Sequence, residues 1–291
     1  MKKDRLWSLF LIATVIFMIV CGCRLIQIVL RYQEADRLYD DIEKEVFEPD
    51  IPAEDGKNQK DENDTGVKPT VDFHKLISIN EDVVGWISIP ELDLEYPITQ
   101  GEDNEYYLHH AYNRETNFAG SIFMDYRNME DFQDQNTILY GHNMLNGSMF
   151  GSLKHLDVNT RPKVIIYTPD SILEYEAVDS RIIGVSEAKY YQASFQEEEF
   201  LSVLQEICPE ISKIEGERIL TLSTCNGNSA QRRIMRCRLV RDSNSNSSYR
   251  SENFFIDRLY AGLGGSASIS DSGSCRRGCF FVRKLGRSES V

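Results

Sequence analysis

Between residues 83 and 240 the chain is a succession of short β-type runs with few helical stretches between them. Many strands at this spacing favour a mostly antiparallel β-barrel or β-sandwich over a doubly wound α/β fold. Both all-β arrangements remain open at this point. The predicted strands are 83–89, 92–98, 120–125, 137–141, 163–168, 172–185, 218–224 and 232–240.

Helices are expected at the edges of this β-rich region. Short ones are predicted at 72–79, 104–110 and 148–156, and a longer one at 194–208. In the longer helix Ser194 is a candidate N-cap because Glu197 follows three residues later, which is the spacing of a capping box.

The N-terminal segment constrains the compartment. Residues 6–23 form a run of 18 uncharged, mostly apolar residues after the sequence MKKDR. That length can just span a bilayer, and the preceding positive charges favour an inside N-terminus. We therefore predict a single-pass anchor in the cell membrane with the rest of the chain outside. A cleaved signal peptide is the alternative.

Four parts are predicted along the chain. Residues 1–30 form a cytoplasmic tip and transmembrane anchor, and residues 31–70 a helical stalk followed by an acidic linker. Residues 71–241 form the globular domain. Residues 242–291, which open on a low-complexity Ser/Asn run, are expected to be a disordered tail.

Charge and cysteine content exclude several functions. The formal charge of −14 argues against nucleic acid, which needs clustered Lys and Arg. The seven cysteines do not form a disulfide framework, because only Cys208, Cys225 and Cys237 fall in the globular part. Cys275 and Cys279 form one isolated CxxxC and lack the two further ligands of a zinc site. No metal and no cofactor is predicted.

Cys225 differs from the other cysteines in its position. It closes a strand-like run that starts at Ile219 and stops in the turn 226–228, so its thiol is expected at the rim of a sheet. Arg232 opens the next strand, and His142 follows another. The remaining histidines lie in predicted helical stretches and are expected at the surface, namely His74, His109, His110 and His155. Cys208 and Cys237 are expected to be small buried hydrophobes.

These three residue types suit acyl transfer. A thiolate is the nucleophile, and a nearby histidine pairs with it and protonates the leaving amine. An arginine stays protonated and is suited to stabilising an oxyanion. The expected roles are therefore nucleophile for Cys225, acid/base for His142 and electrostatic partner for Arg232, in a thiol transferase outside the membrane.

The same residues carry a family resemblance. The sequence TLSTC at 221–225, with an arginine opening the next strand, resembles the sortase signature TLxTC…R. The segments 140–144 and 147–151 look like the histidine segment of class B sortases, and so do 82–87, 96–100 and 119–128. The similarity runs in order from about residue 72 to 240 and covers neither the stalk nor the tail.

The resemblance implies a fold and an activity. The fold is an eight-stranded β-barrel with peripheral helices. The activity is that of a membrane-anchored cysteine transpeptidase of Gram-positive bacteria, which cuts a sorting signal after threonine through a thioacyl intermediate. The implied partners are surface proteins with an NPxTx-like signal, and an amine of cell-wall peptide or of a pilin lysine. The alternative hypotheses are a thiol peptidase that mainly hydrolyses its peptide substrate, and a catalytically inactive, membrane-tethered binding module.

Further site residues follow from the resemblance. The family's strand pattern favours Arg232 over the adjacent Arg233, and alternation allows only one of them to face the cysteine. Anchoring of proteins to the cell wall and assembly of pili are both compatible with the resemblance. The implied substrate-binding residues are Asn104, Leu108, Tyr190, Tyr191 and Ser223.

Overall fold

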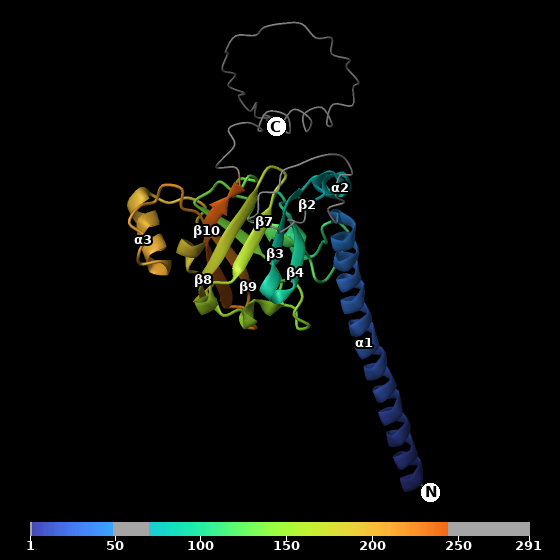
Figure 1. Cartoon of the computed structure of the whole chain (residues 1–291). Coiled ribbons are helices and arrows are strands. Elements are labelled where there is room, and N and C mark those ends of the chain that lie inside the picture. Colours follow the sequence, from blue (N-terminus) through green and yellow to red (C-terminus); the bar gives the residue numbers. More distant parts are fainter. Residues whose placement is uncertain (1, 49–69, 244–291) are drawn as a thin grey trace, which may run out of the picture. The chain divides into compact units, whose positions relative to one another are not determined.

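The computed structural model describes residues 2–48 and 70–243, and its main feature is a closed β-barrel (Figure 1). The strands close in the order β10-β8-β7-β3-β4-β5-β6-β9. The prediction of a mostly β, eight-stranded barrel is confirmed, and the sandwich alternative is excluded. The strands are β3 (Val83–Ile89), β4 (Leu94–Thr99), β5 (Ile122–Met124), β6 (Asn136–Tyr140), β7 (Lys163–Tyr167), β8 (Ile172–Gly184), β9 (Ile219–Cys225) and β10 (Gln231–Asp242).

Two of the eight neighbouring strand pairs are parallel. These are β4–β5 and β6–β9, while the other six pairs are antiparallel. Because β6 and β9 run in the same direction, their carboxyl ends lie at the same edge of the barrel. The residues that follow Tyr140 and those at the end of β9 are therefore neighbours, although about 80 residues separate them in the chain.

Side-chain alternation divides β9 and β10 between two environments. Leu220, Leu222, Met235 and Cys237 are fully buried inside the barrel core. Their neighbours along the strands therefore point to the outer face. That face is covered in part by α3 (Glu197–Ile207), whose buried side chains form a second apolar cluster with Ile219. The outer face of β9 and β10 consequently contains buried polar groups.

The predicted anchor and stalk form one continuous helix, α1 (Lys2–Val46). The stretch from Trp7 onward is long and apolar enough to cross a membrane, judged by length and composition. Two short strands and a capped helix lead into the barrel. They are β1 (Phe47–Glu48), β2 (Thr70–Val71) and α2 (Phe73–Ile79), the last capped by Asp72.

The other helix predictions need correction. The segments 104–110 and 148–156 contain only short 3-10 helices, and Ser194 is not an N-cap. α3 begins at Glu197 after Gln196, and the Phe195 N–H is bound instead by the Gln135 side chain at 2.6 Å. The predicted linker and tail fall mostly outside the described residues. The 3-10 helices are η1 (Pro90–Leu92), η2 (Tyr106–Leu108), η3 (Phe150–His155), η4 (Val158–Thr160) and η5 (Ala188–Tyr191).

Candidate active site

Cys225 is the exposed end of an otherwise buried strand. The residues of β9 before it are all buried, and Cys225 alone is exposed. Its carbonyl oxygen accepts a hydrogen bond from Asn143 Nδ2 at 2.9 Å. The thiol-bearing residue is thus fixed through its backbone, and its side chain lies on the outer face with Ser223.

His142 reaches the same edge through the parallel β6–β9 pair. Tyr140 pairs with Ser223, and Gly141 N donates to Ser223 O at 3.2 Å. His142 follows Tyr140 by two residues, just after the end of β6, and Cys225 follows Ser223 by two residues at the end of β9. The His142 Nε2 atom lies 2.8 Å from Leu108 O. A carbonyl oxygen can only accept, so Nε2 carries the proton and Nδ1 is left for proton exchange.

Arg232 is the direct partner of Cys225 in the antiparallel ladder between β9 and β10. Its Nη1 donates to Ser229 O at 3.1 Å and to Gln231 O at 2.9 Å, which ties the guanidinium to the turn after β9. Arg233 pairs with Thr224, on the opposite face. Of the two adjacent arginines, only Arg232 shares a face with Cys225.

The sequence did not single out Asp125, a buried carboxylate bonded to the residue that ends β6. Asp125 and its partners Tyr140, Asn104 and Arg127 form a bonded network that we call the wall of the site. Asp125 is fully buried and accepts hydrogen bonds from Tyr140 Oη at 2.8 Å and Asn104 Nδ2 at 3.0 Å. Arg127 binds it in bidentate fashion at 2.8 and 2.7 Å. Burial pushes the pKa of Asp125 up, but the bonds from Arg127 and Tyr140 outweigh it and hold that pKa below its ordinary value.

Tyr191 extends this wall toward the thiol. Its hydroxyl lies 3.0 Å from Ser223 Oγ, and its ring stacks on Tyr140 with centroids 6.1 Å apart. Arg127 Nη2 also donates to the Tyr191 carbonyl at 3.1 Å. Burial raises the pKa of the Tyr191 phenol, and Cys225 adds to the rise while Arg232 opposes it. The phenol therefore stays protonated at neutral pH, within electrostatic reach of both residues.

Tyr190 lies behind this wall, in a cluster against which Tyr191 packs. It is buried in a small cluster with Ile183 and Ile234 on the outer face of β8 and β10. The Arg236 guanidinium lies 5.2 Å from the centre of its ring. Of the five expected substrate-binding residues, the structure links Asn104, Tyr191 and Ser223 through one bonded network. Leu108 presents its carbonyl to His142, and Tyr190 lies behind the wall.

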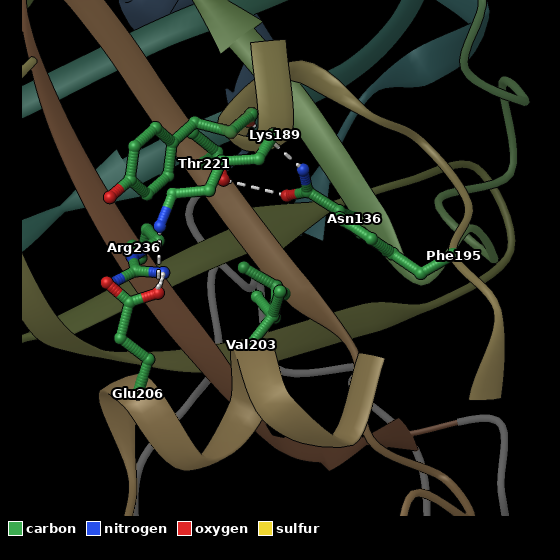
Figure 2. A pocket seen from close by; sticks show the side chains of 9 residues that line it. Asn136, Lys189, Phe195, Val203, Glu206, Thr221 and Arg236 are labelled. Carbon is green, nitrogen blue, oxygen red and sulfur yellow. Dashed lines mark hydrogen bonds and ion pairs between the residues drawn. The ribbon is translucent and has the colours of Figure 1, made fainter. Parts of the chain in front are cut away.

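Arg236 holds together the elements behind that wall (Figure 2). Only 2% exposed, it donates to Asp179 at 2.8 Å and to Glu206 of α3 at 3.4 Å. In Figure 2 it lies beside Thr221, whose hydroxyl donates to Asn136 at 2.7 Å. Arg236 lies four residues after Arg232 on β10 and so shares its face by strand alternation, but nothing in the sequence indicates its burial or its partners.

The comparison with protein families decides the identity. A family model described as the sortase domain matches residues 87–240, which is more than half of the chain. The chain belongs to the sortase family. Sortases are in general cysteine transpeptidases that anchor proteins to the cell wall.

The relatives place this sortase in class B. Sortase B of Listeria monocytogenes is 40% identical over 179 residues, covering 57% of this chain and 73% of the relative. Sortase B of Staphylococcus aureus is 27% identical over 240 residues, covering 77% and 91%. The crystal structure of Bacillus anthracis sortase B in complex with AAEK1 has a TM-score of 0.57 and 32% identity, covering 73% and 99%. The predicted family and class are confirmed.

Proposed function

We propose that this sortase cleaves a C-terminal sorting signal after threonine and joins the surface protein to an amine. Cys225 is the nucleophile, His142 the acid and base, and Arg232 the group that stabilises negative charge. The observation that supports the proposal is the strand register, which brings the backbones of the three residues to one edge of the barrel. Arg232 is the ladder partner of Cys225, and His142 follows the strand that runs parallel to β9.

The reaction has two steps, acylation of Cys225 and transfer of the acyl group to the amine. The Cys225 thiolate attacks the threonine carbonyl carbon, a C–S bond forms, and the scissile C–N bond breaks. Protonated His142 gives its proton to the leaving amine. The acceptor amine then attacks the thioester carbon while His142 takes its proton. A new C–N bond forms, the C–S bond breaks, and the thiolate is restored.

The surroundings of His142 and Arg232 suit these roles. The Leu108 carbonyl holds Nε2 of His142, so Nδ1 exchanges the proton with the reacting groups. Arg232 stays charged and carries five N–H donors in a fixed plane, of which Nη1 supplies the bonds to the turn. The donors beyond Nη1 stabilise the oxyanion that develops on the threonine carbonyl.

The wall built on Asp125 is the proposed binding surface for the sorting peptide. Asn104, Leu108 and Tyr191 contact the peptide, which we expect to be NPxTx-like, and the buried Ser223 holds the Tyr191 hydroxyl. Tyr190 supports the wall from behind. The structure of a Staphylococcus aureus sortase B–substrate complex is similar, with a TM-score of 0.53 and 27% identity over 58% of this chain and 84% of that one. The proposed acceptor is a cell-wall peptide amine or a pilin lysine.

Product analysis tests the activity. The full-length protein in detergent is given an NPxT-containing peptide with and without an amine acceptor, and products are identified by mass spectrometry. The amine should divert product from hydrolysis to a new amide, and Cys225→Ala and His142→Ala should form neither. Hydrolysis that no amine diverts would indicate a thiol peptidase. If a peptide vinyl sulfone labels no residue, or one other than Cys225, the protein is a binding module.

The proposed location is the cell membrane, with residues 1–30 as tip and anchor, 31–70 as stalk and linker, and the catalytic domain of residues 71–241 outside. The apolar part of α1 supports it. A C-terminal epitope tag on intact cells stripped of their wall should be removed by added protease. A tag that survives would place the domain inside.

A further inference from the structure

The part of α1 that follows its apolar stretch packs against the barrel. Ala35, Tyr39, Ile42 and Val46 recur at spacings of four and three residues, and each is at most 4% exposed. This spacing places them on one face of the helix. All four belong to the main hydrophobic core. This half of α1 is therefore a docked element of the catalytic domain.

Tyr39 connects α1 to the segment that holds the His142 ring. Its hydroxyl donates to Gly120 O at 2.5 Å. Gly120 has φ +58°, and a Cβ on it would come within 2.7 Å of the Leu108 carbonyl oxygen. That same oxygen binds His142 Nε2 at 2.8 Å. The Tyr39 hydroxyl is thus bonded to a peptide that packs directly on the partner of the histidine.

A second connection reaches the backbone after His142. Asn146 Nδ2 donates to both carboxylate oxygens of Asp36 at 3.1 Å. Phe150 N donates to His142 O at 3.0 Å and so closes the turn between these two residues. Asn146 lies within this turn. The Tyr39 ring also packs edge-on against Tyr96, with centroids 5.1 Å apart, and the Tyr96 hydroxyl accepts from Met149 N in the same turn.

We propose that the docked half of α1 is a positioning element of the active site, in which Tyr39 and Asp36 hold the two segments that fix His142. The inference rests on the proposed acid/base role of His142. Proton transfer depends steeply on the placement of the transferring group, and a misplacement of about 1 Å can cost roughly 10²-fold in rate. The helix that carries the apolar stretch thereby helps to set the geometry of catalysis.

Single substitutions in the full-length protein test this role. Tyr39→Phe removes the hydroxyl but keeps the ring, and Asp36→Ala removes the partner of Asn146. Each should lower kcat about tenfold while KM for the sorting peptide stays within about twofold. The matched control is Lys75→Met, which breaks the 2.7 Å ion pair between Lys75 and Glu45 of α1, away from His142. This control should keep the wild-type kcat and KM.

The pH profile separates positioning from simple loss of folded protein. Per labelled Cys225 site, the kcat measured over the pH profile should be about tenfold lower in Tyr39→Phe and unchanged in Lys75→Met. Labelling of Cys225 gives the active fraction for each sample. The inference is overturned if both α1 variants keep the wild-type kcat and profile, or lose activity only in proportion to that fraction. Full activity in His142→Ala would instead refute the proposed function.

Discussion

Arg232 lies directly opposite Cys225 in the antiparallel ladder between β9 and β10, whereas Arg233 lies opposite Thr224. Residues paired in this way point to the same face, with Cβ atoms about 5 Å apart. The turn that joins the strands spans only residues 226–230. The Arg232 guanidinium donates to the carbonyl of Ser229 in this turn and to that of Gln231, the first residue of β10. The register therefore places the Arg232 side chain, which carries a permanent positive charge, on the same strand face as Cys225.

Replacing each arginine separately tests this arrangement. Arg232→Ala should lower kcat by roughly 10²- to 10³-fold, because it removes the donor expected at the oxyanion. Arg233→Ala is the matched control and should stay within about twofold of wild type. Turnover of a quenched fluorescent sorting peptide measures both. The reverse result would assign the electrostatic role to Arg233.

Asp125→Asn should destabilise the domain by about 2 kcal/mol, because a buried carboxylate loses charge-assisted bonds from Arg127 and Tyr140. KM should rise as well, since the same network holds Asn104 and the Tyr191 carbonyl. Urea unfolding and steady-state kinetics measure the two effects. Asp170→Asn, at an exposed position, is the control. Unchanged stability would mean that the network contributes nothing net.

The lowered pKa of Asp125 also predicts a pH dependence of stability. A carboxyl whose pKa is lower in the folded state stabilises the fold fully above its unfolded value, about 3.9. That stabilisation is lost as the pH falls through the folded value. The difference in unfolding free energy between wild type and Asp125→Asn should therefore shrink below about pH 4. A difference that stays constant down to pH 2 would contradict the prediction.

The sequence was sufficient to predict the strands. It also singled out Cys225, His142 and Arg232 as candidates, because each of these residues lies where an apolar run meets a turn. The parallel pairing of β6 with β9 was not predictable in the same way. It joins Tyr140 to Ser223 across two intervening strands and α3, and no local pattern encodes such a contact. The family resemblance, rather than strand spacing, brought His142 and Cys225 together in advance.

Residues whose partners come from distant elements were missed or misassigned. Asp125 ends a predicted strand before a polar turn, which is a usable signal, but its bonds to Asn104 and Tyr140 cross from other elements. Tyr190 and Tyr191 are adjacent in η5, and Tyr191 packs against the cluster that Tyr190 forms with Ile183 and Ile234, but only the Tyr191 hydroxyl lies beside Ser223. Arg236 shares the face of Arg232 by strand alternation, but its ion-pair partners Asp179 and Glu206 come from β8 and α3.

Tyr191→Phe should raise KM about three- to tenfold with little change in kcat, because it removes one hydrogen bond to Ser223 beside the peptide-binding wall. The raised pKa of Tyr191 keeps the phenol protonated at neutral pH, so this effect should not vary between pH 6 and 8. Tyr190→Phe is the matched control, because its hydroxyl lies 3.4 Å from Arg181 and not beside Ser223. An equal rise in KM for both variants would contradict the assignment of the wall to Tyr191.

Arg236→Met should destabilise the protein by about 3 kcal/mol, since it removes a buried cation from Asp179 and Glu206. Loosening of α3 and η5 should speed proteolytic cleavage between residues 185 and 210. KM should rise because Tyr191 lies in this segment, and adding Tyr191→Phe should raise it little further. Arg238→Met is the control, because Arg238 lies on the same strand and binds Glu217, outside α3 and η5. Unchanged cleavage and KM in Arg236→Met would mean that the apolar contacts of α3 alone hold the segment.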